Sequence, residues 1–157
     1  MVGSIRGQMS ASGKRVAIVV SRWNELITNE LLQGAVDELE RHGAQVDVVS
    51  VPGTWEVPLA ASSLLKRKEK RPDGIVALGC ILQGATPHAQ LLASDVSSAL
   101  TQLQIESNVP IGWGILTPET QEQALERAGL KLGNKGREAA LAVIEMMSVI
   151  QQILNKS

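Results

Sequence analysis

A chain of 157 residues with 44% hydrophobic and 20% charged residues has the composition of a soluble globular protein built on one core. Fifteen lysine and arginine residues against sixteen aspartate and glutamate residues give a net charge of -1, which argues against a nucleic-acid partner. The single cysteine, Cys80, excludes an intrachain disulfide and favours a cytoplasmic setting, and no apolar run predicts a membrane span.

Short β-branched runs alternate with longer segments of helical periodicity along the chain. The predicted strands are 15–20, 46–51, 74–79 and 109–115. The predicted helices are one carrying the stripe Leu31, Leu32, Ala35, Val36 and Leu39, then 55–70, one through 92–103, 118–128 and 135–154. Such alternation predicts a single α/β domain, a three-layer α/β/α sandwich with a four-stranded parallel sheet.

Residues 1–14 precede the first strand–helix unit and form an N-terminal arm. Residues 4–9 have the pattern of a short strand, but the first unit offers them no obvious partner. Two interpretations stay open: an edge strand added to a neighbouring subunit, or a frayed terminus.

The three tryptophans are the only Trp, Phe or Tyr residues in the chain. Trp23, Trp55 and Trp113 are each predicted to lie at the end of a strand. Ligands of open α/β sheets bind beyond the carboxyl ends of the strands. The tryptophans therefore predict a flat, partly aromatic ligand.

The loop after the third predicted strand carries the strongest chemical signal. Thr86 and Pro87 are predicted to start a helix, as its N-cap and first helical residue. Backbone N–H groups at Gly84 and Ala85 would then form an anion site, with His88 on the first helical turn available for proton transfer. A capped helix with an incidental histidine is the alternative, and the loop alone does not decide.

Other charged residues have two interpretations each. Glu56, in the first turn of a predicted helix, either complements the helix dipole or accepts hydrogen bonds from ligand hydroxyls. Arg127 is a surface charge or a ligand for phosphate or carbonyl groups. The basic run 66–71 is interpreted as a solvated helix end rather than a polyanion patch.

Several chemistries lack their motifs. The first strand is followed by neither the dinucleotide fingerprint nor a P-loop. No Cys/His cluster has metal-ligand spacing, and His42 and His88 are accompanied by no Gly-x-Ser-x-Gly elbow. The sequence thus predicts neither a metal nor a cofactor, and disfavours redox chemistry, NTP hydrolysis and triad hydrolysis.

Taken together and in order, these motifs resemble the 6,7-dimethyl-8-ribityllumazine synthase family from about residue 3 to 154. They are 21–24, 51–58, 84–88, 126–129 and 133–136. The resemblance implies a cofactor-free transferase of riboflavin biosynthesis with a flavodoxin-like fold. Such an enzyme condenses 5-amino-6-(D-ribitylamino)uracil with 3,4-dihydroxy-2-butanone 4-phosphate through an imine, releasing phosphate and water.

The resemblance also implies site residues. His88 would transfer protons, and Trp23 would stack on the pyrimidine. The other implied substrate-binding residues are Thr54, Trp55 and Glu56 at the ribityl chain, Cys80, Ile81 and Leu82 along the pyrimidine, Ala85 and Thr86 at the phosphate, and Trp113, Arg127 and Lys135, these last three reaching the site from a neighbouring subunit.

An obligatory homo-oligomer follows from that sharing. Family members form pentamers, and some build icosahedral shells of twelve pentamers, a feature that accompanies an uninterrupted turn such as 129–133. Riboflavin synthase is a further implied partner.

The chain departs from the family pattern beside His88. Ala89, Gln90 and Leu91 stand where an aromatic residue, Asp and usually Tyr are found, and Gln83 replaces a usual Arg. A non-catalytic lumazine- or flavin-binding protein, or a shell-forming structural protein, of the same fold is therefore the alternative. A flavodoxin-like or receiver-type signalling domain shares the α/β alternation. This chain, however, lacks the acidic cluster after the first strand and the phosphoacceptor Asp at the end of the third strand that such a domain would carry.

Overall fold

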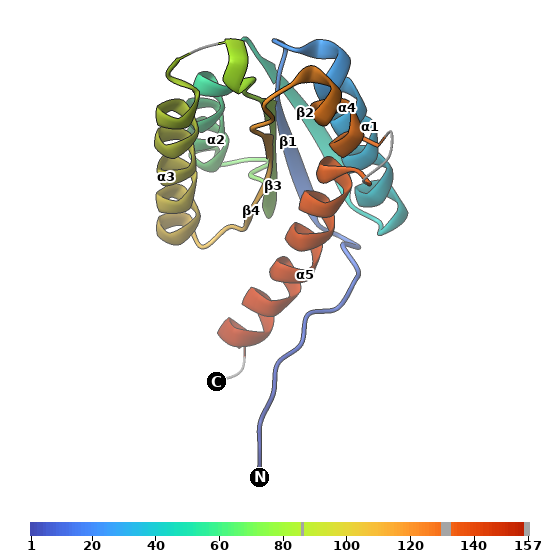
Figure 1. Cartoon of the computed structure of the whole chain (residues 1–157). Helices are drawn as coiled ribbons and strands as arrows, with labels where there is room; N and C mark the ends of the chain where they lie inside the picture. The colour runs from blue at the N-terminus through green and yellow to red at the C-terminus, as the bar shows by residue number, and fades with distance from the viewer. Residues whose placement is uncertain (86, 130–132, 156–157) are drawn as a thin grey trace.

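The computed structural model describes residues 1–85, 87–129 and 133–155 (Figure 1). Its centre is one sheet of four parallel strands in the order β2-β1-β3-β4. The strands are β1 (Arg15–Ser21), β2 (Gln45–Val51), β3 (Gly74–Cys80) and β4 (Ile111–Leu116). The predicted four-stranded parallel sheet is confirmed.

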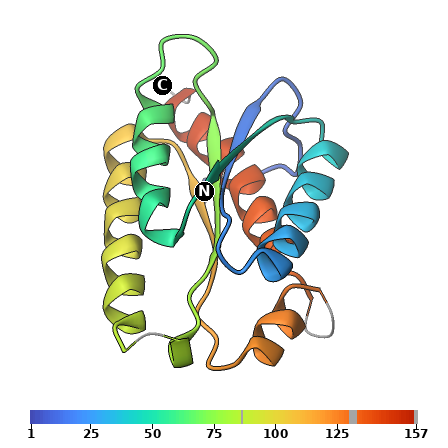
Figure 2. The same ribbon diagram turned by 90° about the horizontal axis from the view of Figure 1, so that it is seen from above.

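Helices cover both faces of the sheet, which Figure 2 shows from above. One face carries α1 (Glu25–Arg41) and α5 (Lys135–Asn155), and the other carries α2 (Val57–Leu65) and α3 (Ala89–Ser107). The short α4 (Gln121–Arg127) lies on the α1 side. This is the expected three-layer α/β/α sandwich of flavodoxin-like type.

The two core layers follow from the alternation of side chains along each strand. Ile18 and Leu78 belong to the cluster shared with α1 and α5, whereas Val19 and Ala77 belong to the cluster shared with α2 and α3. Every residue of β3 is buried. Such continuous burial is typical of a central parallel strand and explains why residues 74–80 are almost purely apolar.

Two helix boundaries differ from the sequence prediction. α2 ends at Leu65, not near residue 70, because the chain turns at Lys66 and the Arg71 side chain donates a hydrogen bond of 2.9 Å to the Leu65 carbonyl. The basic run therefore follows the helix as an exposed loop. α3 begins at Ala89, because the backbone of His88 (φ -108°, ψ 18°) lies outside the α-helical region.

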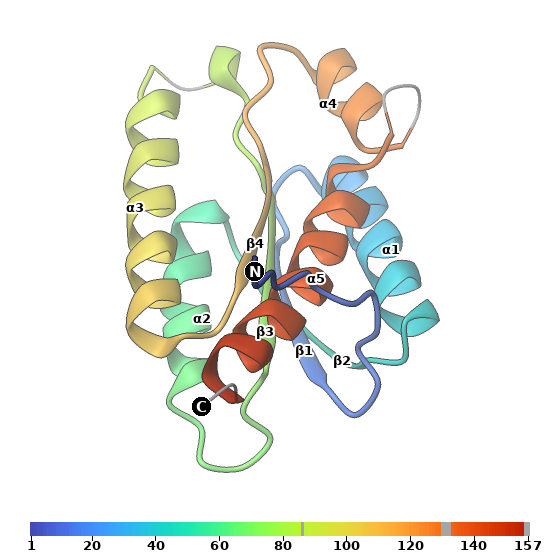
Figure 3. The same ribbon diagram turned by 90° about the horizontal axis from the view of Figure 1, so that it is seen from below.

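The N-terminal arm contains no strand within this chain. Its residues extend along α5 (Figure 3), where the Gln8 N–H donates to Ser148 Oγ at 2.9 Å and Gln152 donates to the Arg6 carbonyl at 2.8 Å. Ala11 is fully buried, and its N–H donates to the His42 carbonyl at 2.8 Å. The arm is thus anchored at its base, and pairing of residues 4–9 with a neighbouring subunit stays a prediction.

Candidate functional site

The loop after β1 holds an exposed indole at the carboxyl edge of the sheet. Backbone bonds from Arg22 to the Val51 carbonyl (2.8 Å) and from Trp23 to the Pro52 carbonyl (3.0 Å) continue the pairing of β1 with β2. The Trp23 ring packs on Gly53, where a Cβ would stand 2.3 Å from a ring carbon, yet 64% of Trp23 remains exposed. The ring is therefore fixed in place while a broad surface stays open for stacking.

Asn24 fixes this loop to the central strand. Its backbone has φ 66°, in the left-handed region that Asn tolerates better than most residues, and its side-chain amide donates to the Cys80 carbonyl at 3.0 Å. Sequence reasoning gave Asn24 no role. The signal that was available is its place at the end of a polar loop directly before a helix.

The turn after β2, a one-turn helix η1 (Thr54–Glu56), lies beside Trp23. Thr54 is buried against Gly79 of β3, and Trp55 is 62% exposed. Glu56 Oε2 is buried, as is the hydroxyl of Ser21, and neither atom has a hydrogen-bond partner among the described residues. Because buried polar atoms are normally paired, these two oxygens are suited to hydroxyl groups of a ligand.

The end of β3 presents backbone groups to a ligand and has no reactive thiol. Burial raises the pKa of the Cys80 thiol to about 11, so this group stays neutral at physiological pH. Ile81 is buried and Leu82 half-buried, and the Ile81 N–H donates to the Leu116 carbonyl at 2.8 Å. These three residues can line a ligand but cannot supply a nucleophile.

The turn that follows β3 is hydrogen-bonded to the loop after β4. Its one-turn helix η2 (Gln83–Ala85) is held by Gln83, whose N–H donates to the Pro118 carbonyl at 3.0 Å and whose side-chain amide donates to the Thr117 carbonyl at 2.7 Å. Sequence reasoning noted Gln83 as a departure but did not expect these bonds. Thr86, the predicted N-cap, lies outside the described residues.

His88 is exposed and directly precedes α3, as its N-cap residue. The prediction that Pro87 opens the helix is wrong by two residues, and His88 lies before the first turn rather than inside it. His88 still contributes to the start of α3, since its carbonyl accepts the Leu92 N–H at 2.9 Å. The imidazole is thus carried at the junction of the η2 turn and the helix.

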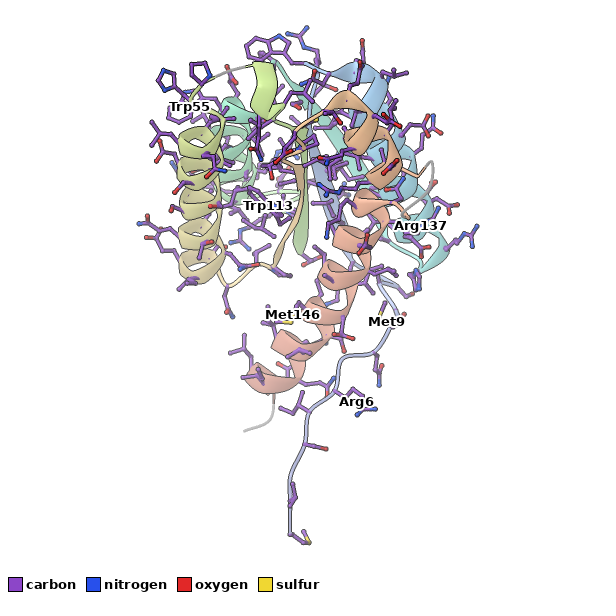
Figure 4. The ribbon with its side chains drawn as sticks, in the orientation of Figure 1. Arg6, Met9, Trp55, Trp113, Arg137 and Met146 are labelled. Atoms are coloured by element: carbon purple, nitrogen blue, oxygen red, sulfur yellow. The ribbon has the colours of Figure 1, made fainter. Side chains whose placement is uncertain are left out.

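Trp113 does not end a strand. It is the third residue of β4, paired with Ala77, and three more strand residues follow it. It is 39% exposed and lines a groove of 370 Å³ between α3 and β4. Figure 4 shows Trp113 between α3 and the sheet, away from Trp55 at the loop end. The expectation of three equivalent strand-end tryptophans therefore fails for Trp113.

Arg127 and Lys135 lie on the other face of the sheet. Arg127 ends α4 and is half-buried; Lys135 begins α5, with Nζ 4.0 Å from a carboxylate oxygen of Glu138. An isolated antiparallel bridge between Ala128 and Asn134 joins the segments that carry them. Within one chain, these two cations therefore belong to neighbouring segments at the end of α4 and the start of α5.

Residues 1–85, 87–129 and 133–155 hold no group of three or more His, Cys, Asp or Glu side chains arranged for a metal ion. Over the same residues, no helix combines the length and the apolar character that crossing a bilayer requires.

Fold and site together define an α/β protein whose candidate ligand site lies at the carboxyl edge of a parallel sheet. The 6,7-dimethyl-8-ribityllumazine synthase family matches residues 13–151. The 6,7-dimethyl-8-ribityllumazine synthases of Nitratidesulfovibrio vulgaris strains DP4 and Miyazaki F are each 44% identical to this chain over 155 residues, covering 97% of this chain and 98% of the relative. The chain belongs to the 6,7-dimethyl-8-ribityllumazine synthase family and is a transferase of riboflavin biosynthesis.

Proposed function

We propose that this chain condenses 5-amino-6-(D-ribitylamino)uracil with 3,4-dihydroxy-2-butanone 4-phosphate to give 6,7-dimethyl-8-ribityllumazine. The observation that carries this proposal is the pairing, at one edge of the sheet, of the exposed Trp23 ring with the buried, unpartnered Oε2 of Glu56. A flat heterocycle bearing a polyhydroxyl chain needs one stacking face and one hydroxyl acceptor side by side. This edge offers both.

The chemistry needs orientation and proton transfer rather than a cofactor. The uracil amine attacks the ketone, and loss of one water gives an imine. Loss of a proton from C3 then expels phosphate from C4 and leaves an enol, which tautomerises to a ketone at C3. The ribitylamino nitrogen attacks this new carbonyl, and loss of a second water closes the ring. Holding two oriented substrates can lower such a barrier by roughly 7–11 kcal/mol.

The pyrimidine would stack on Trp23 and lie along the backbone of residues 80–82. Its ribityl hydroxyls would meet Thr54, Trp55 and Glu56, whose turn is fixed against β3. The neutral Cys80 thiol would serve as a contact surface only, in accord with its raised pKa.

The phosphorylated substrate would bind at the η2 turn, with Ala85 and Thr86 supplying backbone N–H groups. His88, just beyond this turn, would transfer protons near neutral pH. Arg127, Lys135 and Trp113 would come from a neighbouring subunit. In support of that sharing, Arg127 and Lys135 are carried on the α1 and α5 side of the sheet, whereas His88 precedes α3 on the other side (Figure 2).

A site that takes residues from a neighbouring subunit requires a homo-oligomer. We propose a pentamer that can assemble into an icosahedral shell of twelve pentamers. The exposed face of the β4 edge strand supports it, since the groove lined by Trp113 is open, and α2 and α3 expose Leu59, Leu91 and Ile105. Riboflavin synthase, as user of the product, is the further proposed partner, and the lone cysteine favours the cytoplasm.

Mixing the two substrates with the purified chain tests the function. We expect lumazine absorbance and fluorescence to appear together with one inorganic phosphate per product, and a butanone without phosphate to react poorly. Tight lumazine binding without product formation would instead establish the non-catalytic alternative. Light scattering on the same sample measures the molar mass of the assembly and so gives its oligomeric state.

A further inference from the structure

Asn134 uses its whole side-chain amide to join three segments of the chain. Its Nδ2 donates to the Glu30 carbonyl of α1 at 2.9 Å and to the Ala128 carbonyl after α4 at 3.0 Å. Its Oδ1 accepts the Arg137 N–H at 3.0 Å in the first turn of α5. Both donor hydrogens and the acceptor are therefore in use, so the amide can occupy one orientation only.

Gly34 of α1 provides the space in which this amide lies. A Cβ on Gly34 would stand 2.6 Å from the Cγ, Nδ2 and Oδ1 atoms of Asn134. The planar amide thus rests directly on the backbone of α1. A glycine in the interior of an exposed helix costs stability, and this contact gives the glycine a structural reason.

Asn134 is flanked by two cations of the proposed site, Arg127 and Lys135. Its donor bond to Ala128 ends one residue after Arg127, and Lys135 is the next residue in the chain. The Ala128–Asn134 bridge joins the same two points through the backbone. Asn134 therefore joins the end of α4 to the start of α5 through both its side chain and its backbone.

The packing of α5 on α1 does not depend on Asn134. Arg137 Nη1 donates to Asp37 Oδ2 at 3.1 Å and also to Glu38 (the labelled Arg137 in Figure 4). Gly136 lets the two helices approach closely, since a Cβ there would stand 2.1 Å from the Leu31 carbonyl oxygen. Loss of the Asn134 amide should consequently leave the fold intact and free only the segment beside it.

We propose that Asn134 is a positioning residue for the phosphorylated substrate, holding Arg127 in place relative to the start of α5. This inference rests on the proposed function, because it takes Arg127 to be a phosphate ligand. Asn134 itself does not touch the substrate.

An ordinary helix cap is the competing role, and two variants separate the roles. Asn134→Ser and Asn134→Asp both keep an oxygen that can cap α5, but neither can donate to the Glu30 and Ala128 carbonyls as an amide does. Asn134→Ser adds no charge near the phosphate. If capping were the whole role, both variants would behave like the wild type.

Steady-state kinetics with each substrate varied in turn gives the decisive measurement. For Asn134→Ser we expect the KM for the butanone phosphate to rise about tenfold, with the KM for the uracil substrate changed by less than about twofold. A drop in kcat alone, or equal rises in both KM values, would overturn the proposal, because a merely structural loss gives that result.

Gly34→Ala supplies a second test that needs no activity. In the wild type the added methyl group must displace the Asn134 amide, so the melting temperature should fall. In the Asn134→Ala background the space is empty, and the same change should raise the melting temperature, since alanine favours helix. An equal shift in both backgrounds would show that Asn134 does not lie as described, and would overturn the proposal.

Binding of inorganic phosphate separates failure of this inference from failure of the proposed function. If the wild type forms no lumazine, the proposed function fails, while weaker phosphate binding by Asn134→Ser than by wild type would still uphold the role of Asn134. If the wild type is active and both phosphate binding and KM are unchanged in Asn134→Ser, the function stands and the inference is wrong.

Discussion

Two segments of the proposed site, 81–85 and 127–129 with 133–135, are held in place by different means. The first continues the pairing of β3 with β4, through backbone bonds from Ile81 to Leu116 and from Gln83 to Pro118. The second is held by the Asn134 side chain, together with a single backbone bridge between Ala128 and Asn134. A backbone ladder tolerates changes of side chain, whereas a single amide does not. We therefore expect the first segment to be robust to substitution and the second to be fragile.

The segments differ in chemistry as well. His88, just beyond the first segment, is the proposed proton-transfer residue. Arg127, in the second segment, is proposed to bind the phosphate group of the substrate. Substitutions in the two should thus affect different kinetic constants.

The largest effect is expected for His88→Ala. Removing a general acid–base group should lower kcat roughly 10²–10⁴-fold and leave slow residual turnover, because orientation of the substrates is retained. Stopped-flow and steady-state measurements of lumazine formation give kcat. Complete loss of turnover in a folded, correctly assembled variant would contradict this division of roles.

Arg127→Ala is the matched contrast from the second segment. Losing a charge-assisted hydrogen bond of about 1.5–3 kcal/mol should raise the KM for the butanone phosphate roughly 10–100-fold, with a smaller effect on kcat. If kcat fell as far as in His88→Ala, the two segments would not differ in function.

Gly136→Ala tests the helix packing directly after the second segment. The new methyl group would stand 2.1 Å from the Leu31 carbonyl oxygen, an atom of the backbone that cannot move alone. Separating α1 from α5 should lower the free energy of unfolding by about 3 kcal/mol, measured as a melting temperature at fixed protein concentration.

Gly84→Ala is the control from the first segment. Its Cβ would meet the Glu119 carbonyl at 3.5 Å, an ordinary contact, so the unfolding free energy should change by less than about 0.5 kcal/mol. Equal destabilisation in the two variants would remove the contrast between the segments.

Sequence patterns predicted the sheet well, because β-branched runs such as 16–20 and 46–51 report strands locally. The interpretation of Trp113 as a strand-end residue is wrong, because the predicted strand 109–115 already extends past it and β4 continues to Leu116. The start of α3 and the end of α2 were also misjudged. The decisive contacts, such as that of Arg71 with the Leu65 carbonyl, are made by side chains and leave no local pattern.

The residues that fix the site could not have been predicted from local patterns. Asn24 bonds to a residue 56 positions away, Gln83 to one 34 away and Asn134 to one 104 away. A polar residue in a loop gives no local sign of such a partner. Only the assembled sheet brings each amide to its carbonyl.

A smaller effect is expected for Gln83→Ala in the first segment. The variant loses the 2.7 Å bond to the Thr117 carbonyl but keeps the backbone bond to Pro118. The unfolding free energy should fall by about 1 kcal/mol, with the KM for the butanone phosphate changed by less than about threefold. A KM rise as large as that expected for Arg127→Ala would show that the backbone ladder alone does not hold the turn.

The smallest effect concerns Cys80, the last residue of β3 before the first segment. Burial raises the pKa of this thiol to about 11 from an ordinary 9.0, so the folded protein keeps the proton to higher pH than the unfolded chain does. The resulting stabilisation is complete below pH 9 and is lost as the pH rises towards 11. Urea unfolding at pH 8 and above pH 10 should therefore show a steeper loss of stability in the wild type than in Cys80→Ala, and the native thiol should resist alkylation at pH 8. Parallel pH profiles, or rapid alkylation of the folded chain, would mean that the end of β3 opens to solvent, and the first segment would then be less rigid than its backbone bonds indicate.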